Sequence, residues 1–291
     1  IWHYQTTPGE MWDYTATQHM ILADLTIEGK KRKVLMQAPK NGFFYVLDRT
    51  NGEFISGAPF VSGITWAKGL DEKGRPVEMP GVGKGPEIIS PSPDGAHNWN
   101  PIAFSPATGL VYLAAKSGEQ MLHPPDPNFK YDPNRVNIGM QAMYDGPLAA
   151  KMSTFLPAVG ELVAWDPVKQ KEAWRVKQPT VESGGVLATG GNLVFQGRAD
   201  GTLAAYRAND GKQVWSFDTG TGIIAPPVTY SVGGTQYVTV MAGWGGAPGL
   251  FNAPGSGPVK PGFARVLTFA LGGNATLKAT PYGHKEPPSP A

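Results

Sequence analysis

The sequence predicts an all-β protein built as a partial β-propeller of about four blades, each a four-stranded sheet docked to its neighbour by tryptophan. Three observations lead to this fold class. Short segments rich in β-branched and aromatic residues recur along the chain. One hairpin-like segment repeats at an offset of 41 residues. The 38 glycines and 28 prolines among 291 residues leave little room for long helices.

The expected strands are bounded by Gly, Pro, Asn or Asp, which punctuate β-structure. They cover residues 31–39, 42–50, 109–116, 160–167, 192–199, 201–208, 212–217, 235–243 and 264–272. Only residues 15–25 also suit a helix. Their second half, HMILADL, is equally acceptable as a buried strand, because periodicity cannot separate the two in a short apolar run. We expect a strand there.

The repeat consists of AWDPVKQKEAW (164–174) and AYRANDGKQVW (205–215), with a weaker copy in VLDRTNGEFIS (46–56). In each copy a small residue ends one strand, a polar turn follows, and the next strand begins. Gly52 and Gly211 fall at matching places, and Trp174 and Trp215 are expected to dock between blades. A period near 41 with four strands per unit is typical of propellers. The alternative is coincidence between two unrelated hairpins of a β-sandwich.

The strands group into blades at 15–60, 97–178 and 184–218, with three strands in a last group at 223–272. We expect residues 1–272 to form one partial propeller and residues 273–291 to be a Pro-rich linker or tail. WHYQ at the start suggests the outer strand of another blade. We therefore expect the chain either to close its own ring, with residues 1–5 beside 264–271, or to associate.

Two insertions, 61–96 and 118–157, interrupt the repeats, and loops of this length usually shape a site or wrap a partner. The net charge of +2 and the scattered basic residues argue against a nucleic-acid partner. Without cysteine, these residues can form no disulfide, thiolate site or CxxCH haem attachment. Five dispersed histidines give no metal-binding spacing, and no apolar run approaches the roughly 18 residues needed to span a bilayer.

Asp13 in PGEMWDYT and Lys40 in QAPKNGFFYVLD are the first candidates for chemistry. A carboxylate beside aromatic rings can act as a general base or as an oxygen ligand for a hard cation such as Ca²⁺. The alternative for Asp13 is a turn residue that caps the backbone of the next strand. The alternative for Lys40 is an ordinary solvated lysine, since KNG is a turn signal.

HNWNP (97–101) sets two carboxamides around an indole, a combination that can hydrogen-bond and stack on a planar polar ligand. Its alternative is a blade-packing Trp with Asn side chains that satisfy turn amides. GWGGAPG (243–249) is a Gly-rich loop through which backbone can approach a ligand closely, although it lacks the sequence context of a phosphate loop. The alternative interpretation of GWGGAPG is a turn whose backbone conformation requires glycine and that binds no ligand.

Together, YQTTPGEMWDYTATQ, VLMQAPKNGFFYVLDRTNGE, HNWNP, GGVLATGGNLVFQG and GWGGAPG carry a resemblance that runs from Trp2 to about Gly273. The chain resembles the C-terminal half of the quinoprotein alcohol dehydrogenases, most closely the type II quinohaemoprotein branch. These enzymes use pyrroloquinoline quinone (PQQ) and Ca²⁺ on an eight-bladed propeller of tryptophan-docked blades. The resemblance implies oxidation of a primary alcohol to an aldehyde.

Carried over residue by residue, Asp13 matches the catalytic aspartate, which abstracts or orients the alcohol proton and lies close enough to be a Ca²⁺ ligand. Lys40 matches the cation that hydrogen-bonds the quinone carbonyl oxygens, and Asn98 and Trp99 match the pair at the cofactor rim. Ala247 falls where methanol dehydrogenases carry a bulky Trp that narrows the substrate pocket. A small residue there implies room for a larger alcohol.

The resemblance also implies partners outside these residues. The N-terminal half of the family supplies the Glu and Asn ligands of Ca²⁺, a vicinal disulfide over the cofactor and a Trp floor beneath it. Haem c is expected only in a further domain, and the electron acceptor would be a cytochrome c or a quinone. A periplasmic location follows from the same resemblance. The alternative function is that of a noncatalytic propeller scaffold, an assembly module or an inactive fragment.

Overall fold

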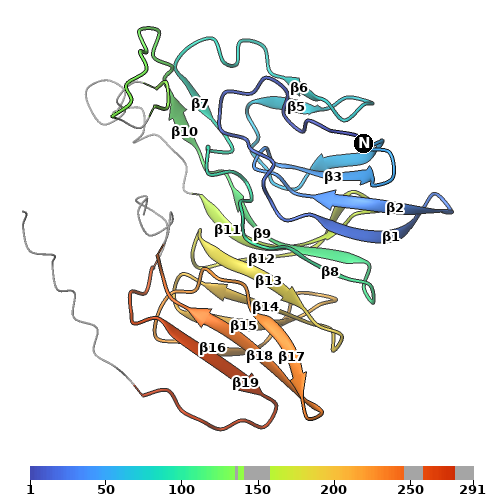
Figure 1. Cartoon of the computed structure of the whole chain (residues 1–291), viewed down its shortest axis with the longest axis vertical. Helices are drawn as coiled ribbons and strands as arrows, with labels where there is room; N and C mark the ends of the chain where they lie inside the picture. The colour runs from blue at the N-terminus through green and yellow to red at the C-terminus, as the bar shows by residue number, and fades with distance from the viewer. Residues whose placement is uncertain (135–136, 141–157, 246–257, 279–291) are drawn as a thin grey trace, which may run out of the picture.

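A computed structural model of the chain describes residues 1–134, 137–140, 158–245 and 258–278, and every regular element in it is a β-strand. Three sheets have four strands each, one sheet has three, and two small sheets have two strands each. The four large sheets follow one another in chain order from the upper right to the bottom of Figure 1. Among the described residues, no helix has the length and apolar character required to cross a membrane.

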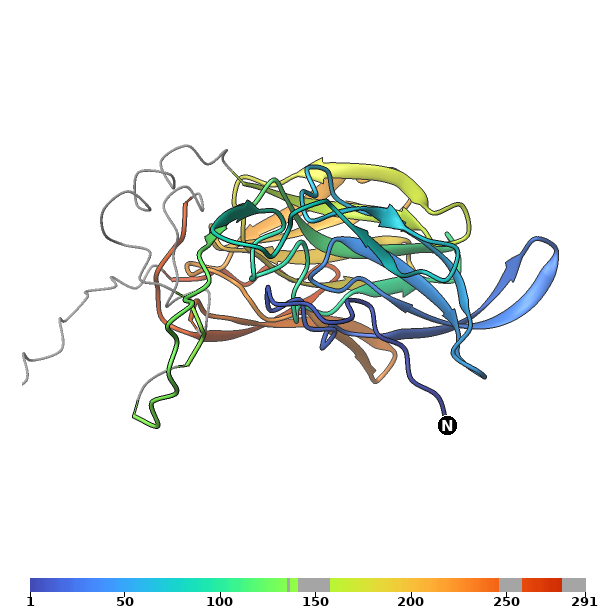
Figure 2. The same ribbon diagram turned by 90° about the horizontal axis from the view of Figure 1, so that it is seen from above.

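The first sheet is an antiparallel meander that matches the expected blade at residues 15–60. It contains β1 (Ile21–Ile27), β2 (Lys30–Gln37), β3 (Phe43–Asp48) and β4 (Phe54–Pro59), paired in that order. The ambiguous segment 15–25 is therefore a strand in its second half, where the residues of β1 pair with β2 through Ile21 opposite Met36. Figure 2 shows the β1–β2 hairpin, in blue, extending past the other sheets.

The next three sheets also match the expected groups. The second contains β8 (Ala103–Ser105), β9 (Leu110–Ser117), β11 (Val159–Asp166) and β12 (Lys171–Lys177). The third contains β13 (Ser183–Ala188), β14 (Leu193–Arg198), β15 (Thr202–Arg207) and β16 (Gln213–Asp218). The last contains β17 (Val228–Val232), β18 (Thr235–Ala242) and β19 (Arg265–Ala270). All nine strands expected from the sequence are present.

The two insertions form small sheets of their own. The first contains the hairpin of β5 (Ala67–Leu70) and β6 (Pro76–Glu78), followed by β7 (Glu87–Ile89). In the second insertion, β10 (Met121–His123) pairs antiparallel with β7, with Met121 opposite Ile89. Segments from both insertions are thereby joined next to the first and second sheets.

Packing between successive sheets explains the strand composition. In β9, Val111 and Leu113 face a core shared with the first sheet, whereas Tyr112 faces a core shared with the third. Successive side chains of a strand point to opposite faces. Both faces of a central blade are covered, which accounts for the nearly continuous apolar sequence of β9 and β11.

The repeat has the same backbone geometry in all three copies. The hairpin register shifts after Val46, Ala164 and Ala205, the residues that open the repeat. Such a β-bulge places two residues opposite one and increases the local twist. The shared bulge confirms that the sequence repeat is a structural one and excludes the coincidence of unrelated hairpins.

Tryptophan docks on the turn glycine of the following sheet. The Trp174 indole lies over Gly211, where an added Cβ would be 2.6 Å from Cε3, and its Nε1 donates to the Ala208 carbonyl over 2.9 Å. Trp2 packs in the same way on Gly52. Trp215 instead packs edge-on against Phe269 of the last sheet, with ring centroids 5.3 Å apart.

At the junction between the first and second sheets, two polar side chains take the place of the tryptophan and the glycine. Ser56 occupies the repeat position of the docking Trp, and Gln170 occupies that of the turn glycine, with a positive φ of 50°. The Gln170 Nε2 donates to the Ser56 Oγ over 3.0 Å. A hydrogen bond thus links these two sheets at the position where the Trp174 ring on Gly211 links the second and third sheets.

The start of the chain differs from the expectation. Residues 1–5 form no strand and do not lie beside β19. They cover the first sheet, where Trp2 packs on Gly52 and the Tyr4 hydroxyl donates to the Gly74 carbonyl over 2.9 Å. The expectation that residues 1–5 close the ring beside 264–271 is therefore wrong, because the rings of Trp2 and Tyr4 are half-buried against Gly52 and Gly74 instead.

Candidate functional site

Asp13 lies in a turn whose shape is fixed by a neighbouring carboxylate. Glu10 Oε2 accepts the backbone N–H groups of Trp12 over 2.7 Å and of Tyr14 over 2.9 Å. The rings of Trp12 and Tyr14 are buried, whereas the Asp13 side chain is 64% exposed and its φ is 62°. Glu10 therefore caps the backbone of this turn, a role that the structural interpretation of the sequence gave to Asp13. The Asp13 carboxylate takes no part in the hydrogen bonds of the turn.

Lys40 lies between β2 and β3 with its side chain only 9% exposed, so it is not an ordinary solvated turn lysine. Its Nζ donates to Asp13 Oδ2 over 2.8 Å, and its carbonyl accepts the Ala96 N–H over 3.0 Å. The side chain runs directly over Gly95. A Cβ at Gly95 would lie 2.4 Å from Lys40 Cγ, so only glycine leaves room for the lysine.

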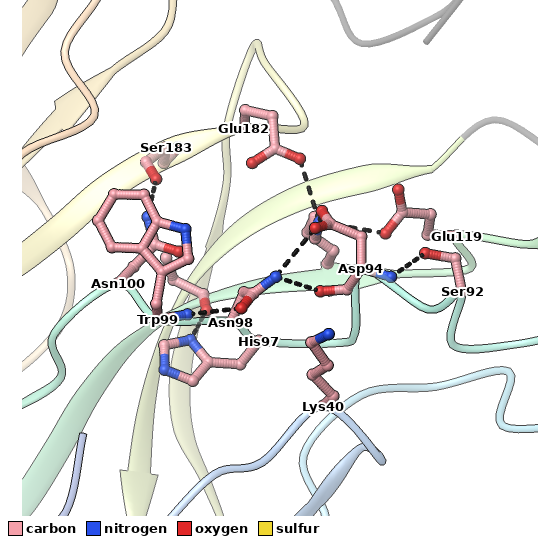
Figure 3. A network of polar contacts seen from close by, with 12 residues as sticks. Lys40, Ser92, Asp94, His97, Asn98, Trp99, Asn100, Glu119, Glu182 and Ser183 are labelled. Carbon is pink, nitrogen blue, oxygen red and sulfur yellow. Dashed lines mark hydrogen bonds and ion pairs between the residues drawn. The ribbon is translucent and has the colours of Figure 1, made fainter. Parts of the chain in front are cut away.

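Asn98 and Trp99 follow in the same loop. Asn98 Nδ2 donates to both the carbonyl and Oδ1 of Asp94, each over 2.9 Å, while Asn98 Oδ1 accepts the Trp99 N–H over 2.9 Å (Figure 3). The Trp99 side chain is 45% exposed and does not pack between blades. The Asn98 amide therefore hydrogen-bonds polar groups of the turn, as the structural interpretation of HNWNP expected. The Trp99 indole, however, is exposed to solvent and is not packed between blades.

A cluster of four charges, of which only Asp94 is exposed, connects this loop to the strands behind it. Lys116 Nζ pairs with Asp94 and also lies 3.2 Å from Glu119 Oε2 and 3.1 Å from Glu182 Oε1. Burial opposes the lysine charge, but the three carboxylates outweigh it and hold the pKa of Lys116 well above its ordinary value. Burial raises the pKa of the Glu182 carboxyl. The Lys116 ammonium already pairs with all three carboxylates of this acidic cluster, so we do not treat it as a candidate cation site.

His97 is fully buried beside the loop. Its Nδ1 lies 2.8 Å from the Ala114 carbonyl, and its Nε2 has no hydrogen-bond partner among the described residues. Burial lowers the pKa of His97 to about 4, so the imidazole is neutral at physiological pH. It is a packed core group beside the loop.

The structure thus brings Asp13 and Lys40 together and connects them to the loop that carries Asn98 and Trp99. Ala96 makes the connection, because its N–H donates to Lys40 and its carbonyl accepts the Lys116 N–H over 2.8 Å. Ala247 lies outside the described residues. Ser183, which follows Glu182, has a buried Oγ without a partner among the described residues.

Sequence reasoning missed four residues that shape the site: Glu10, Asp94, Gly95 and Lys116. Asp94 and Gly95 form a DG turn signal three residues before HNWNP, which could have identified the pair as part of the same motif. Glu10 lies three residues before Asp13. Lys116 gives no sufficient local signal, because two of its three carboxylates, Asp94 and Glu182, lie 22 and 66 positions away in the sequence.

The successive bulged, tryptophan-docked sheets are those of a β-propeller, and comparison with known proteins gives the family. A family model described as "Glucose/ethanol/alcohol dehydrogenase, beta-propeller domain", the PQQ family, matches residues 1–58 and 75–238. The chain belongs to this family.

Relatives lie in the same branch that the motifs indicated. The chain is 47% identical over its whole length to quinohemoprotein alcohol dehydrogenase ADH IIB of Pseudomonas putida, and it covers 40% of that protein. It is 48% identical to 1-butanol dehydrogenase (cytochrome c) of Thauera butanivorans, with 96% of this chain and 40% of the relative covered. The chain therefore spans about 40% of the length of these relatives.

A solved structure supports the fold directly. The crystal structure of quinohemoprotein alcohol dehydrogenase from Comamonas testosteroni superposes with a TM-score of 0.84 at 44% sequence identity. The superposition covers 96% of this chain and 42% of that one. The sheets described above are thus a partial propeller of this family.

Proposed function

We propose that this chain is the Asp13-bearing part of an enzyme that oxidises primary alcohols to aldehydes with PQQ and Ca²⁺. The observation that carries the proposal is the ion pair of an exposed carboxylate and a buried ammonium, Asp13 Oδ2 and Lys40 Nζ, 2.8 Å apart. Family membership and the names of the relatives, which include 1-butanol dehydrogenase, support an alcohol as substrate.

The residues of this chain provide part of what PQQ and Ca²⁺ require. A planar quinone bearing carbonyl and carboxylate oxygens suits a lysine with three N–H donors and an exposed indole face, as Lys40 and Trp99 offer. Ca²⁺ takes six to eight oxygen ligands. Asp13 contributes one carboxylate and belongs to no cluster of three metal-type ligands among the described residues. The remaining ligands would come from other parts of the whole protein.

When bound, PQQ accepts the hydride of the alcohol and the metal polarises oxygen. Asp13 is the base of the reaction: its carboxylate removes the proton of the substrate hydroxyl. Oδ2 is engaged by Lys40, while Oδ1 accepts no hydrogen bond from the described residues. Lys40 pairs with Oδ2 and thereby fixes the direction in which Oδ1 points. Asn98 and Trp99 would border the cofactor, with the exposed Trp99 indole offered to it.

The whole protein would contain more than these residues. Haem c, which the name quinohemoprotein implies for the relatives, would lie in another part, since this chain has no cysteine. We propose a cytochrome c or a quinone as the electron acceptor and the periplasm as the location; the name of the Thauera relative gives cytochrome c. Ala247 would widen the pocket for alcohols larger than methanol.

The remaining part of the protein, or a second copy, would also cover the open sheets. Among the described residues the last sheet has three strands, and Val232, Met241 and Val266 on it are exposed. Exposed apolar strand faces favour association. Light scattering and small-angle X-ray scattering of the isolated chain test this. A monodisperse, C-shaped particle of 31.0 kDa at high concentration would contradict it.

The activity is tested in the whole protein by titrating PQQ with and without Ca²⁺, followed by absorbance, and by assaying 1-butanol with an artificial acceptor. Asp13→Asn should keep the fold and lower kcat by about 10²–10⁴-fold, the usual effect of a general base. Asp24→Asn is the matched control, because Asp24 is 67% exposed and pairs with Arg49 over 3.0 Å. It should keep full activity.

Near-normal turnover in Asp13→Asn would refute the role of Asp13. A protein that binds no PQQ and oxidises no alcohol would leave the noncatalytic scaffold as the function. If a chelator that removes Ca²⁺ leaves the activity unchanged, the role of Ca²⁺ in the proposed reaction is refuted.

A further inference from the structure

We propose that Lys116 is a positioning residue for the cofactor rim: it holds Asp94, Asp94 holds the Asn98 amide, and Asn98 holds Trp99. This inference rests on the proposed function, since it takes Trp99 as a residue that faces the cofactor. It deepens that proposal by adding two residues, Lys116 and Asp94, that touch neither cofactor nor substrate.

The first step concerns Asn98. Its two amide hydrogens serve the carbonyl and Oδ1 of Asp94, and its Oδ1 takes the Trp99 N–H. A primary amide has only two N–H donors. The amide hydrogens and the amide oxygen of Asn98 therefore all bind groups of the loop, and no N–H donor of Asn98 remains for a ligand. Its effect on the cofactor passes through the orientation of Trp99, which leaves the exposed indole to make the contact.

The second step concerns Asp94, which depends on Lys116. The oxygens of Asp94, Glu119 and Glu182 lie within 4.8 Å of one another, so the three carboxylates would repel without a cation. Asp94 is the exposed member and therefore the one free to turn toward solvent. Lys116, itself 8% exposed, pairs with all three and keeps Asp94 turned inward, where its other oxygen meets Asn98.

The third step concerns rigidity. Lys116 lies in β9, and its backbone N–H donates to the Ala96 carbonyl over 2.8 Å, so strand and loop are linked by both main chain and side chain. A site residue supported by a strand is held more precisely than one supported by a loop. The loop 94–99 gains this precision from β9 through Lys116, although it belongs to no strand itself.

The test uses the whole protein labelled with 5-fluorotryptophan, and the Trp99 resonance is assigned by its loss in Trp99→Phe. Lys116→Met should shift or broaden this resonance in the absence of PQQ. It should also weaken PQQ binding by about 10-fold, similar to the loss that follows when a group orienting a metal ligand is removed. Lys116→Arg should retain both properties, because it restores the cation.

Arg175→Met is the matched control. Arg175 lies in β12 of the same sheet and pairs with Glu161 and Glu172, so its loss also breaks an ion-pair cluster. It touches neither Asp94 nor Asn98. This variant should leave the Trp99 resonance and the PQQ affinity unchanged, which separates positioning from general destabilisation.

If Lys116→Met does not fold, Asp94→Asn replaces it, because the amide keeps the shape of the carboxylate and removes its attraction for Lys116. An unchanged Trp99 resonance and unchanged PQQ affinity in a folded variant would overturn the inference. Failure of the unaltered protein to bind PQQ would instead refute the proposed function. In that case the fluorine spectra still decide whether Lys116 positions Trp99.

Discussion

Tryptophan docking makes a quantitative prediction about Gly211. Replacing it by alanine forces an L-residue to adopt a φ of +71° and places a Cβ 2.6 Å from Trp174 Cε3 and 2.9 Å from Val176 Cγ2. The backbone term costs about 1–2 kcal/mol. Overpacking of a rigid ring adds about 1–3 kcal/mol. Gly211→Ala should therefore destabilise the protein by about 2–5 kcal/mol.

Gly29→Ala provides the matched control. Gly29 lies in the β1–β2 turn with a φ of +75°, and nothing lies within 4 Å of its added Cβ. Only the backbone term applies, so this variant should lose about 1–2 kcal/mol. Urea unfolding followed by tryptophan fluorescence measures both variants under the same conditions.

The difference between the two variants reports the contacts that the added Cβ makes with Trp174 and Val176. In a Trp174→Ala background the ring is gone and only the Val176 contact remains, so most of this difference should disappear. Equal losses for Gly211→Ala and Gly29→Ala in the presence of Trp174 would refute the reasoning, because they would mean that the ring moves aside without cost.

Three further predictions follow from the polar contacts. Burial lowers the pKa of His97 to about 4, below its unfolded value near 6.5. The contribution of the neutral imidazole to the free energy of unfolding should therefore be fully present above pH 6.5 and fall by about 3 kcal/mol as the pH decreases toward 4. Unfolding of His97→Gln measured over the same pH range should lack this fall. A double-mutant cycle of Ser56→Ala and Gln170→Ala should give a coupling of about 1 kcal/mol, and a coupling of zero would exclude their hydrogen bond as a link between sheets. Lys40→Met should weaken PQQ binding but change the melting temperature little, because the exposed Asp13 carboxylate stays hydrated; a large fall in melting temperature with intact affinity would make Lys40 structural.

The sequence by itself determined the strands, their grouping into sheets and the repeat. These features are encoded locally. Alternating side chains fix the faces of β9, and the recurring turn at Gly52 and Gly211 fixes the hairpin. The motifs also selected Asp13 and Lys40, since each lies in a short, specific stretch of sequence.

Only the tertiary structure decided which side chains meet. Lys40 reaches Asp13 across 27 positions, and Lys116 reaches Glu182 across 66. Local patterns carry no information about such contacts, because stacking of the sheets and pairing of the two insertions through β7 and β10 bring these residues together. Burial follows from the same stacking. A lysine in a KNG turn is expected in solvent, and the segments around residues 13 and 95 remove it from water.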